Sequence, residues 1–364
     1  MILLVHNRYR VPGGEERAVA DLEWLIASEL GEEVRVLGRD SARLSSAAAA
    51  RGLLAGGLDA DEVGDAVRAT GARVVHAHNV NPAFGWRGLA AARAAGARVV
   101  LHLHNYRLVC ANGICFTQGE DCTRCQGRRT WPGVRLNCRG GSRAESAVYA
   151  AALATWQKRL CAQVDAFVVP SAFALRRLRE LRAPVGDRVH VVASVQREFA
   201  DGAAPVADGP VLFAGRPAVE KGVWDAVAAC RAAGRRLVVA GDGPALEELR
   251  AAGVDCRGRL GPEELRVLRA GAAAAIVPSR YQEILPLAAL EAMAAGLPVV
   301  ATRSGGLAEA VPEEGLASVG DVPALAQRLR ALAGDAGAGE RALARVRDLC
   351  SPARVAERLR GVYG

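Results

Sequence analysis

Two glutamates, Glu283 and Glu291, stand on either side of a predicted strand-to-helix turn. A helix is predicted over residues 287–295, because Pro286 suits a first turn, where a missing N–H costs nothing, and Gly296 suits the end. Glu283 then lies in the loop before the helix and Glu291 lies within it. Carboxylates at two levels can accept hydrogen bonds from the hydroxyls of a long polyol ligand, an arrangement that suits a nucleotide-sugar.

Two cations, Arg216 and Lys221, follow a predicted strand at residues 211–214 and share one Gly-rich loop. Lys221 is notable because the chain holds only one other lysine, Lys158. An arginine fork and a lysine point charge can together clamp a diphosphate, and they would stabilise the charge on a leaving phosphate. The alternative is a solvent-exposed Glu220–Lys221 surface pair. If the two cations do bind a diphosphate, Glu220 would help to orient the lysine.

Glycine-rich turns follow several of the predicted strands. Glycine lets the backbone approach a ligand closely, and the free N–H groups of a helix start attract anions. In the first such turn, the following acids Glu15 and Glu16 have the alternative role of complementing the helix dipole. The glycines predicted to bind the donor are Gly13, Gly14, Gly215, Gly241, Gly243, Gly305 and Gly306.

Five of the six histidines lie at or just beyond the C-terminal ends of predicted strands in the first half of the chain. Ligands of open α/β sheets bind at that edge, although a histidine there can instead point sideways and satisfy a backbone carbonyl. A shared metal is disfavoured, because no carboxylate accompanies the group at a familiar spacing. These histidines are His6, His76, His78, His102 and His104.

Five cysteines fall between residues 110 and 138, with a tight C-x-x-C pair among them. Any four of them would suffice for a structural zinc site, although their spacing is irregular. The alternative is a reduced, partly buried loop, since a disulfide is disfavoured in the cytoplasm. The predicted ligands are Cys110, Cys115, Cys122, Cys125 and Cys138.

The same region, residues 106–142, is rich in arginine and contains Trp131. It follows the strand that ends at His104, so we hypothesise that it forms an acceptor-binding or membrane-contacting lobe. The later helix predicted over residues 171–182 has an apolar stripe and a basic face, a pattern that is more typical of a core helix than of a membrane binder.

The chain of 364 residues is long enough for two domains, each with its own core. Apolar strands alternate with helices, and after a polar stretch at residues 201–210 that is typical of a linker the alternation starts again, with strands predicted at 211–214, 237–240 and 274–277. This predicts an α/β protein with two Rossmann-like, doubly wound parallel-sheet domains that face a central cleft. The predicted parts are an acceptor-side domain at 1–205 with its insert at 106–142, a nucleotide-sugar-binding domain at 206–348, and a C-terminal helix at 349–364 that packs back on the first domain.

The net charge of +8 comes almost entirely from arginine and favours acidic partners such as diphosphates, anionic lipid surfaces and polyanionic glycans. Nucleic acid is not expected, because a basic groove would usually carry aromatic stacking platforms. No apolar stretch is long enough to span a membrane, and no basic leader precedes the first strand. A cytoplasmic protein is therefore expected, with contact to the inner face of the membrane as a further option.

These motifs together resemble glycosyltransferase family 4 over nearly the whole chain. One difference is that many family members carry Gly-Phe-Gly where this chain has Ile284, Leu285 and Pro286; a branch of the family has Pro-Leu at the last of these and the next position. The matching pieces are Gly13–Glu16, His104-Asn105, Gly215-Arg216 with Glu220–Gly222, Gly241–Pro244, the paired glutamates, and Ser304–Gly306 with Glu309.

The resemblance implies a GT-B fold and a retaining transfer of a sugar from a nucleoside-diphosphate-sugar to a glycan, lipid-linked or small-molecule acceptor. Arg216 and Lys221 would take the diphosphate, Glu291 the ribose hydroxyls and Glu283 the sugar hydroxyls. His104 would face the donor sugar and the acceptor. No metal cofactor is then required for catalysis, because the two cations can stabilise the leaving group.

Two alternatives remain from the sequence. A sugar-nucleotide epimerase of the same fold needs similar Arg and Glu contacts. A non-catalytic, Cys-rich nucleic-acid-binding protein is more distant, because it leaves the motifs of the second half without a purpose.

Overall fold

The computed structural model describes residues 1–10, 13–139 and 142–364. By their contacts these residues form two compact units. The first comprises Met1–Thr117, Cys122–Val195 and Pro352–Gly364, and the second comprises Gln118–Asp121 and Gln196–Ser351. Each unit contains one six-stranded parallel sheet, so the predicted pair of doubly wound α/β sheets is confirmed.

The sheet of the first unit has the strand order β2-β1-β3-β4-β7-β8. Strand β1 lies between β2 and β3; its first four residues are apolar, and all but the last of its residues are buried, as expected for a parallel strand covered by helices. Ile2 of β1 pairs with Val34 on one side and Val74 on the other. The strands are β1 (Ile2–Arg8), β2 (Val34–Asp40), β3 (Val74–Ala77), β4 (Arg98–His102), β7 (Ala166–Val169) and β8 (Val189–Val191).

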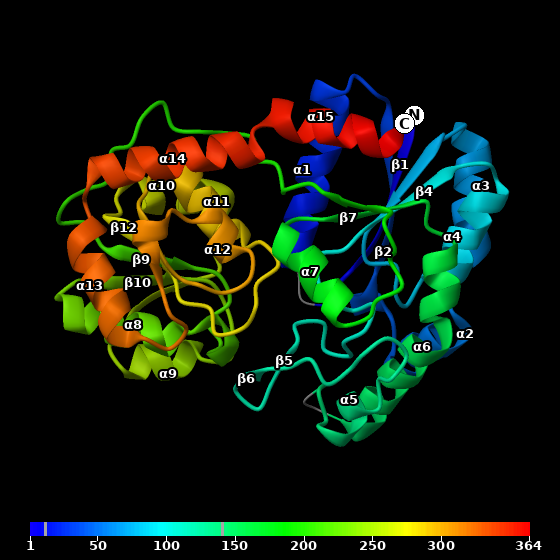
Figure 1. Ribbon diagram of the computed structural model, residues 1–364, viewed down its shortest axis with the longest axis horizontal. Coiled ribbons are helices and arrows are strands. Elements are labelled where there is room, and N and C mark those ends of the chain that lie inside the picture. Colours follow the sequence, from blue (N-terminus) through cyan, green and yellow to red (C-terminus); the bar gives the residue numbers. More distant parts are fainter. Residues whose placement is uncertain (11–12, 140–141) are drawn as a thin grey trace. The chain divides into compact units, whose positions relative to one another are not determined.

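Helices cover both faces of this sheet, with α1 and α15 on one side and α3 and α4 on the other (Figure 1). Alternate strand residues, such as Ile2, Leu4 and Val100, form a core with apolar side chains of α1 and α15. The helices are α1 (Gly14–Glu29), η1 (Ser41–Arg43), α2 (Ser46–Ala55), α3 (Ala60–Thr70), α4 (Gly85–Ala94), α6 (Arg143–Ala162), α7 (Ala172–Glu180) and α15 (Pro352–Tyr363).

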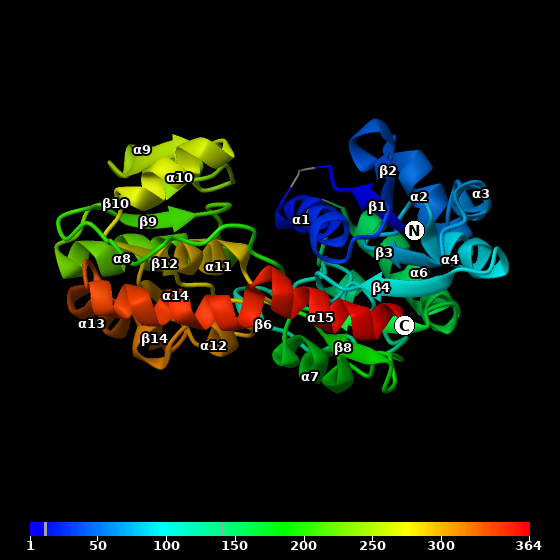
Figure 2. The same ribbon diagram turned by 90° about the horizontal axis from the view of Figure 1, so that it is seen from above.

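The last helix, α15, belongs to the first unit although the whole second unit precedes it in the sequence (Figure 2). Its terminal Tyr363 is buried, and the Tyr363 hydroxyl lies 2.7 Å from Nδ1 of His76. The side chain of Arg98 donates a hydrogen bond to the carbonyl of Val362, with 3.0 Å between the two atoms. The end of the chain therefore completes the core around β3 and β4.

The segment between β4 and α6 has little regular structure. Its described residues contain two strands of two residues each and one helix of four residues. These are β5 (Phe116–Thr117), β6 (Glu120–Asp121) and α5 (Pro132–Arg135). Its positions must therefore be held by contacts other than a sheet or a long helix.

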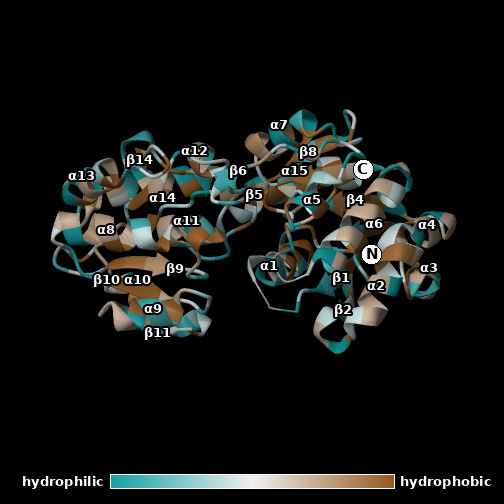
Figure 3. Cartoon of the chain, turned by 90° about the horizontal axis from the view of Figure 1, so that it is seen from below, coloured by the Kyte–Doolittle hydropathy of each residue, from teal (hydrophilic) through white to brown (hydrophobic). Residues whose placement is uncertain are grey.

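The sheet of the second unit has the strand order β11-β10-β9-β12-β13-β14, and its strands β9 and β10 are strongly hydrophobic (Figure 3). The predicted strands at 211–214, 237–240 and 274–277 match the observed bounds. The short strand β14 was not predicted. The strands are β9 (Val211–Ala214), β10 (Leu237–Ala240), β11 (Asp255–Gly258), β12 (Ala274–Val277), β13 (Val299–Thr302) and β14 (Leu316–Ala317).

Two groups of helices cover this second sheet. Helices α8 and α13 pack on each other and on β13, and α11 packs on β12 and α14. The helices are η2 (Val219–Lys221), α8 (Val223–Ala233), α9 (Leu246–Ala251), α10 (Pro262–Ala270), α11 (Leu287–Ala294), α12 (Leu307–Ala310), η3 (Glu313–Gly315), α13 (Val322–Leu332) and α14 (Ala336–Cys350).

The polar stretch at residues 201–210, which the sequence suggested as a linker, is hydrogen-bonded within the second unit. The N–H of Ala203 donates to Oε1 of Glu340 at 2.6 Å, and the N–H of Val206 donates to the carbonyl of Ala272 at 2.9 Å. The contacts divide the chain after Val195, ten residues before the predicted boundary at 205. Over the described residues, none of the helices is long and apolar enough to cross a membrane.

Candidate active site

A network around the buried carboxylate of Glu283 dominates the second unit. Lys221, at the end of η2, donates to Oε1 of Glu283 at 2.7 Å, and the Ser279 hydroxyl donates to the same oxygen at 2.7 Å. The Tyr281 hydroxyl donates to Oε2 at 2.5 Å, and Lys221 also donates to the Tyr281 oxygen at 3.0 Å. Two residues predicted from their separate motifs, Lys221 and Glu283, are thus in direct contact.

The surroundings keep the Lys221 ammonium charged. Burial alone would lower the pKa of Lys221, but the carboxylate of Glu283 and the Tyr281 oxygen outweigh it, so the pKa is raised. Burial first, and then the charge of Glu283, raise the pKa of the Tyr281 phenol, which therefore stays protonated. Since 27% of the Lys221 side chain is exposed, this fixed cation can still meet a ligand.

Arg216 lies in the same loop as Lys221 but has a different partner. Its guanidinium pairs with Glu220, four residues later, and about half of its side chain is exposed. The predicted orientation of Lys221 by Glu220 is wrong, because Glu220 pairs with Arg216 and Glu283 holds Lys221. The loop after β9 therefore carries one rigid cation and one exposed cation.

The glycines of this loop and of the turn after β10 pack against each other. A Cβ atom at Gly241, whose φ is +152°, would overlap the carbonyl of Gly215, and one at Gly243 would lie 2.7 Å from the carbonyl of Pro217. The loop that carries Arg216 therefore requires residues without a Cβ atom at positions 241 and 243. Donor binding by Gly215, Gly241 and Gly243 stays a prediction.

Gly305 and Gly306, in the turn after β13, hold the loop that carries Glu283. Gly305 donates its N–H to Oε1 of Gln282 at 2.7 Å, and Gly306 donates to the carbonyl of Glu283 at 2.7 Å. A Cβ atom at Gly305 would overlap that same carbonyl. Both N–H groups are engaged in this structure, so phosphate binding by them stays a prediction, and it would require a phosphate to replace these hydrogen bonds.

Glu291 lies within α11, as predicted, and its carboxylate pairs with Arg269 of α10. Sequence reasoning missed Arg269, Ser279 and Tyr281. No local spacing marks Arg269, which is 22 residues from its partner. A ribose role for Glu291 stays a prediction, and it would require the ligand to share or replace Arg269.

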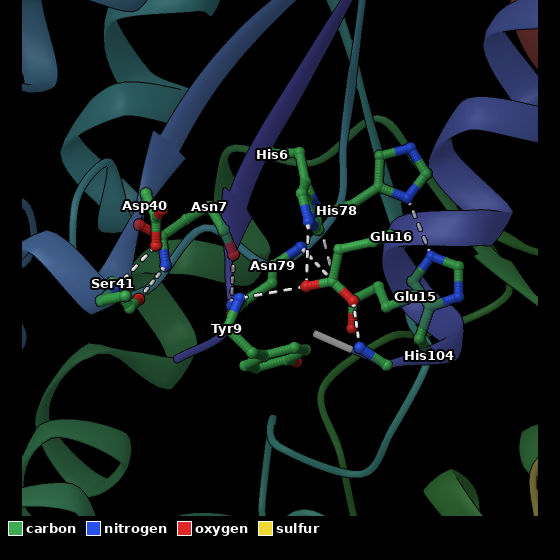
Figure 4. Close-up of polar contacts among 12 residues, drawn as sticks. His6, Asn7, Tyr9, Glu15, Glu16, Asp40, Ser41, His78, Asn79 and His104 are labelled. Atoms are coloured by element: carbon green, nitrogen blue, oxygen red, sulfur yellow. Dashed lines mark hydrogen bonds and ion pairs between the residues drawn. The ribbon is translucent and has the colours of Figure 1, made fainter. Parts of the chain in front are cut away.

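In the first unit, the histidines predicted at the sheet edge come together as a stack. The ring centroids of His102 and His104 are 4.2 Å apart, and those of His76 and His78 are 4.9 Å apart. Nδ1 of His78 lies 2.8 Å from Nε2 of His104 (Figure 4). Since one ring nitrogen of His104 is engaged, Nδ1 is the nitrogen left to meet a ligand. A substrate role for His104 stays a prediction.

The stacked histidines are neutral at physiological pH. Burial lowers the pKa of His104 to about 4 and that of His76 to about 3. Burial also lowers the pKa of His78 and of His102 well below 6.5. Nitrogens of His76, His78 and His102 lie within 4.8 Å of one another, but the rings are nearly parallel, so their in-plane lone pairs do not converge on one ion.

The predicted Gly13-Gly14 turn opens α1, and the two acids that follow it bind backbone N–H groups. Glu16 accepts from the N–H of Gly13 at 2.7 Å and from that of Tyr9 at 3.1 Å. The buried Glu15 accepts from the N–H of Asn79 at 3.1 Å, and burial raises the pKa of its carboxyl (Figure 4). The acids therefore tie the loop after β1 to α1 and to the loop after β3, beyond any effect on the helix dipole.

A cavity of about 480 Å³ lies in the first unit beside this turn. Its wall comes from β1, α1, β2 and η1, and it mixes three arginines with four acids. A cavity with both charge signs suits a polar ligand that carries hydroxyls or an anionic group. The charged lining residues are Arg8, Arg39, Arg43, Glu16, Glu23, Asp40 and Asp59.

The five cysteines predicted as zinc ligands are all brought together. They line one small cavity together with other residues of the segment between β4 and α6 and with Leu181, and none of the five forms a disulfide. Three are buried and two, Cys122 and Cys138, are partly exposed.

Comparisons with known proteins agree with this geometry. Over 147 residues, or 36% of this chain, it is 37% identical to a glycogen synthase of Mycobacterium tuberculosis, and the match spans only 35% of that relative. Sucrose-phosphate synthase from Thermosynechococcus elongatus has the same fold, with a TM-score of 0.70 at 18% identity over 100% of this chain and 98% of that one. Anabaena Alr3699/HepE, solved in complex with UDP-glucose, gives a TM-score of 0.61 at 15% identity, covering 99% of this chain and 98% of that one.

Two family profiles divide the chain between them. The profile described as "Glycosyl transferase 4-like domain" matches residues 13–194, and the one described as "Glycosyl transferases group 1" matches residues 209–335. Together they include His104, Arg216, Lys221 and Glu283. The chain therefore belongs to the group 1 and 4-like glycosyltransferases with the GT-B fold, as the sequence motifs indicated.

Proposed function

We propose that this glycosyltransferase moves a hexose from a nucleoside diphosphate to an acceptor hydroxyl with retention of anomeric configuration. The observation that carries the proposal is the partly buried Lys221–Glu283 pair, which keeps a lysine charged in the same loop as an exposed arginine. A UDP-hexose is the first donor to test, because Alr3699/HepE of the same fold was solved with UDP-glucose.

In this mechanism the charge that develops on the leaving diphosphate is stabilised by Lys221 and Arg216. Lys221 is already fixed by Glu283 and Tyr281, so little reorganisation accompanies the reaction. Arg216 is exposed and can form a fork with a phosphate once it leaves Glu220. Glu283 would hold the lysine, and hydrogen bonds to it from sugar hydroxyls would have to share or replace those from Ser279 and Tyr281.

The bond changes follow a front-face attack. The bond between the sugar C1 and the β-phosphate oxygen breaks, the acceptor oxygen bonds to C1 on the same face, and the acceptor proton passes to the leaving phosphate oxygen. We assign no carboxylate nucleophile, because Glu15 and Glu16 in the first unit are used to bind backbone amides. His104 would contact the substrate through Nδ1.

For the acceptor we propose the cavity of about 480 Å³ in the first unit. Its arginines can bind an anionic group of a glycan or of a lipid-linked sugar, and its acids can accept hydroxyl hydrogens. Contact of the Arg-rich segment with an anionic membrane stays a prediction. Liposome co-sedimentation that does not depend on anionic lipid would contradict it.

The direct test incubates the protein with UDP-glucose and, separately, with GDP-, TDP- and ADP-sugars, and follows nucleoside diphosphate release with and without candidate acceptors. Thermal shifts with the same nucleotides report donor binding independently, because a ligand well above its Kd raises the Tm. Release that requires an acceptor supports the proposal. Conversion of the donor sugar without any acceptor would favour the epimerase alternative.

A further inference from the structure

An ion pair between Asp225 and Arg280 lies in the second unit, close in the sequence to Lys221 and Glu283. Nε and one terminal nitrogen of Arg280 donate to the two carboxylate oxygens of Asp225, at 2.7 and 2.6 Å. This bidentate arrangement is geometrically specific, since both groups are planar. The Asp225 side chain is only 5% exposed, so its charge depends on the arginine for compensation.

The two contacts of Arg280 lie on either side of Lys221 in the sequence. The N–H of Arg280 donates to the carbonyl of Glu220, the residue before Lys221, at 2.9 Å. Its side chain binds Asp225, which lies in the first turn of α8, directly after the turn with Lys221. A single residue therefore holds both ends of the turn that carries Lys221.

The turn with Lys221 also packs directly on the segment that contains Arg280. Gly222, which follows Lys221, has a φ of +68°, and a Cβ atom there would lie 1.9 Å from the carbonyl oxygen of Pro278. Glycine is required for this close approach of the two backbones. Because backbone touches backbone, a displacement of either segment must move the other.

Both chain neighbours of Arg280 donate to Glu283. The Ser279 hydroxyl donates to Oε1 at 2.7 Å, and the Tyr281 hydroxyl donates to Oε2 at 2.5 Å. The carbonyl of Ser279 accepts a hydrogen bond from the buried Thr302 hydroxyl of β13 at 2.6 Å. The segment that orients Glu283 is thus fixed to the sheet at Ser279 and to α8 at Arg280.

Asp225 has a simpler role open to it, since an acid in the first turn of a helix complements the helix dipole. That role needs no partner, and an exposed carboxylate would serve it equally well. A buried carboxylate with a bidentate arginine carries a desolvation cost that dipole complementation does not require. The pair therefore fits a role in holding two segments together better than one in stabilising α8 alone.

We propose that Asp225 and Arg280 are positioning residues for the transfer, and that their ion pair holds the turn with Lys221 against the segment with Glu283. This inference rests on the proposed function, in which Lys221 is the fixed cation at the leaving diphosphate. Neither residue of the pair is assigned a contact with the donor.

The reactivity of Lys221 towards an amine-acylating reagent tests this role without any substrate. Burial lowers the pKa of Lys221, but Glu283 and Tyr281 raise it above its ordinary value, so little free amine is present at pH 9. Lys158, the only other lysine, is exposed on α6 and serves as the reference in the same sample. Mass spectrometry of the digested protein gives the extent of acylation at each lysine.

In Arg280→Gln and in Asp225→Asn, we expect acylation of Lys221 relative to Lys158 to rise at least threefold. Arg341→Gln is the matched control, since Arg341 of α14 pairs with Glu314 in the same unit and is exposed, and it should leave the ratio unchanged. If Arg280→Gln does not fold, Asp225→Asn decides the test, because that variant leaves no buried carboxylate uncompensated. A wild-type ratio in the folded variants would overturn the proposal.

A double-mutant cycle with Lys221 separates positioning from a general structural role. Arg280→Gln should lower kcat for acceptor-dependent release about tenfold, because a misplaced cation stabilises the developing charge less well. On the Lys221→Ala background, the same change should lower kcat by less than about twofold, since the arginine acts through the lysine. Equal losses on the two backgrounds would contradict the positioning role.

The two measurements distinguish this proposal from the proposed function. If Lys221→Ala has normal turnover, the reaction role of Lys221 is wrong, and the acylation ratio decides by itself whether the ion pair holds the lysine. If Lys221→Ala is inactive and both pair variants are acylated like the wild type, the proposed function stands and the positioning role is wrong.

Discussion

In the second unit, the carboxylate of Glu283 accepts hydrogen bonds from Lys221, Ser279 and Tyr281. In the first unit, buried histidines stack on one another, and several of their ring nitrogens have no partner among the described residues. The Glu283 network is charged and its hydrogen bonds are formed. The histidine stack is neutral, and several of its ring nitrogens lack a hydrogen bond within the described part of the chain. Both lie at the carboxyl ends of parallel strands, where ligands of such sheets bind.

The two regions therefore differ in how their charge responds to a change in pH. Although burial alone would lower the pKa of Lys221, Glu283 and Tyr281 raise it, so the lysine keeps its charge over a wide pH range. Buried neutral rings have the opposite property, since each must become charged at a large cost when the pH falls. The second unit thus supplies the fixed charge that the proposed reaction needs. The buried histidines of the first unit make the stability of the protein sensitive to acid.

The largest effect is expected for Lys221→Ala. Loss of a fixed cation beside a developing phosphate charge should lower turnover by about 10²- to 10³-fold. Acceptor-dependent release of nucleoside diphosphate measures it, and thermal melting checks that the protein is folded. Lys158→Ala is the control, because Lys158 is the only other lysine. Turnover close to normal in the Lys221 variant would contradict the assignment.

A comparison of Gly305→Ala with Gly320→Ala tests how the Glu283 loop is held. Both glycines have a positive φ, but only at Gly305 would the new Cβ overlap a backbone carbonyl, that of Glu283. Gly320→Ala should cost about 1–2 kcal/mol from the left-handed backbone alone. Gly305→Ala should cost more and lower turnover about tenfold or further, because a misplaced carboxylate cannot orient Lys221. Equal effects in urea unfolding and in turnover would show that the contact is unimportant.

The pH dependence of stability tests the histidine stack. Burial lowers the pKa of His76 to about 3 in the folded protein, whereas in the unfolded chain it has its ordinary value of 6.5. The unfolded chain binds more protons in that window, so stability present above pH 6.5 is lost as the pH falls. One such histidine contributes roughly 1.4 kcal/mol per pH unit within its window. Urea unfolding at pH 7 to 5 should show a shallower fall for His76→Gln than for the wild type or His190→Gln.

The smallest effect is expected from the contact between His78 and His104. His78→Phe keeps the ring stack but removes the hydrogen bond that orients His104, and a bond of about 1 kcal/mol corresponds to roughly fivefold in kcat. His102→Phe is the matched variant, because the two nitrogens of His102 have no hydrogen-bond partner among the described residues. Equal kcat values for the two variants would remove the positioning role of His78.

The sequence was sufficient for the sheets because their strands are continuous apolar runs between helical stretches. Runs such as Val211–Ala214 and Ala274–Val277 were predicted with the observed bounds. Strands of two residues, such as Leu316–Ala317, are too short to show a periodicity. The stretch at residues 201–210 resembles a linker by composition, but its hydrogen bonds to Glu340 and Ala272 are tertiary and leave no local signal.

For the candidate site, the motifs identified the residues but not their partners. Lys221 and Glu283 were each found from a local pattern, yet their contact joins positions 62 residues apart. The assignment of Glu220 to Lys221 followed from adjacency in the sequence, and the fold turned Glu220 toward Arg216 instead. Likewise, the sequence gives no sign that the N–H groups of Gly305 and Gly306 hydrogen-bond to Gln282 and Glu283, because these partners are distant in the sequence.

The return of α15 to the first sheet has a consequence for how this protein is made. Val355, Leu359 and Tyr363 complete a core whose other members, such as Ile2 and Val74, are synthesised first. During synthesis, the amino-terminal part of the first unit therefore keeps an open hydrophobic face until α15 has been translated. The intervening half has no such delay, and it can fold first although it is translated second.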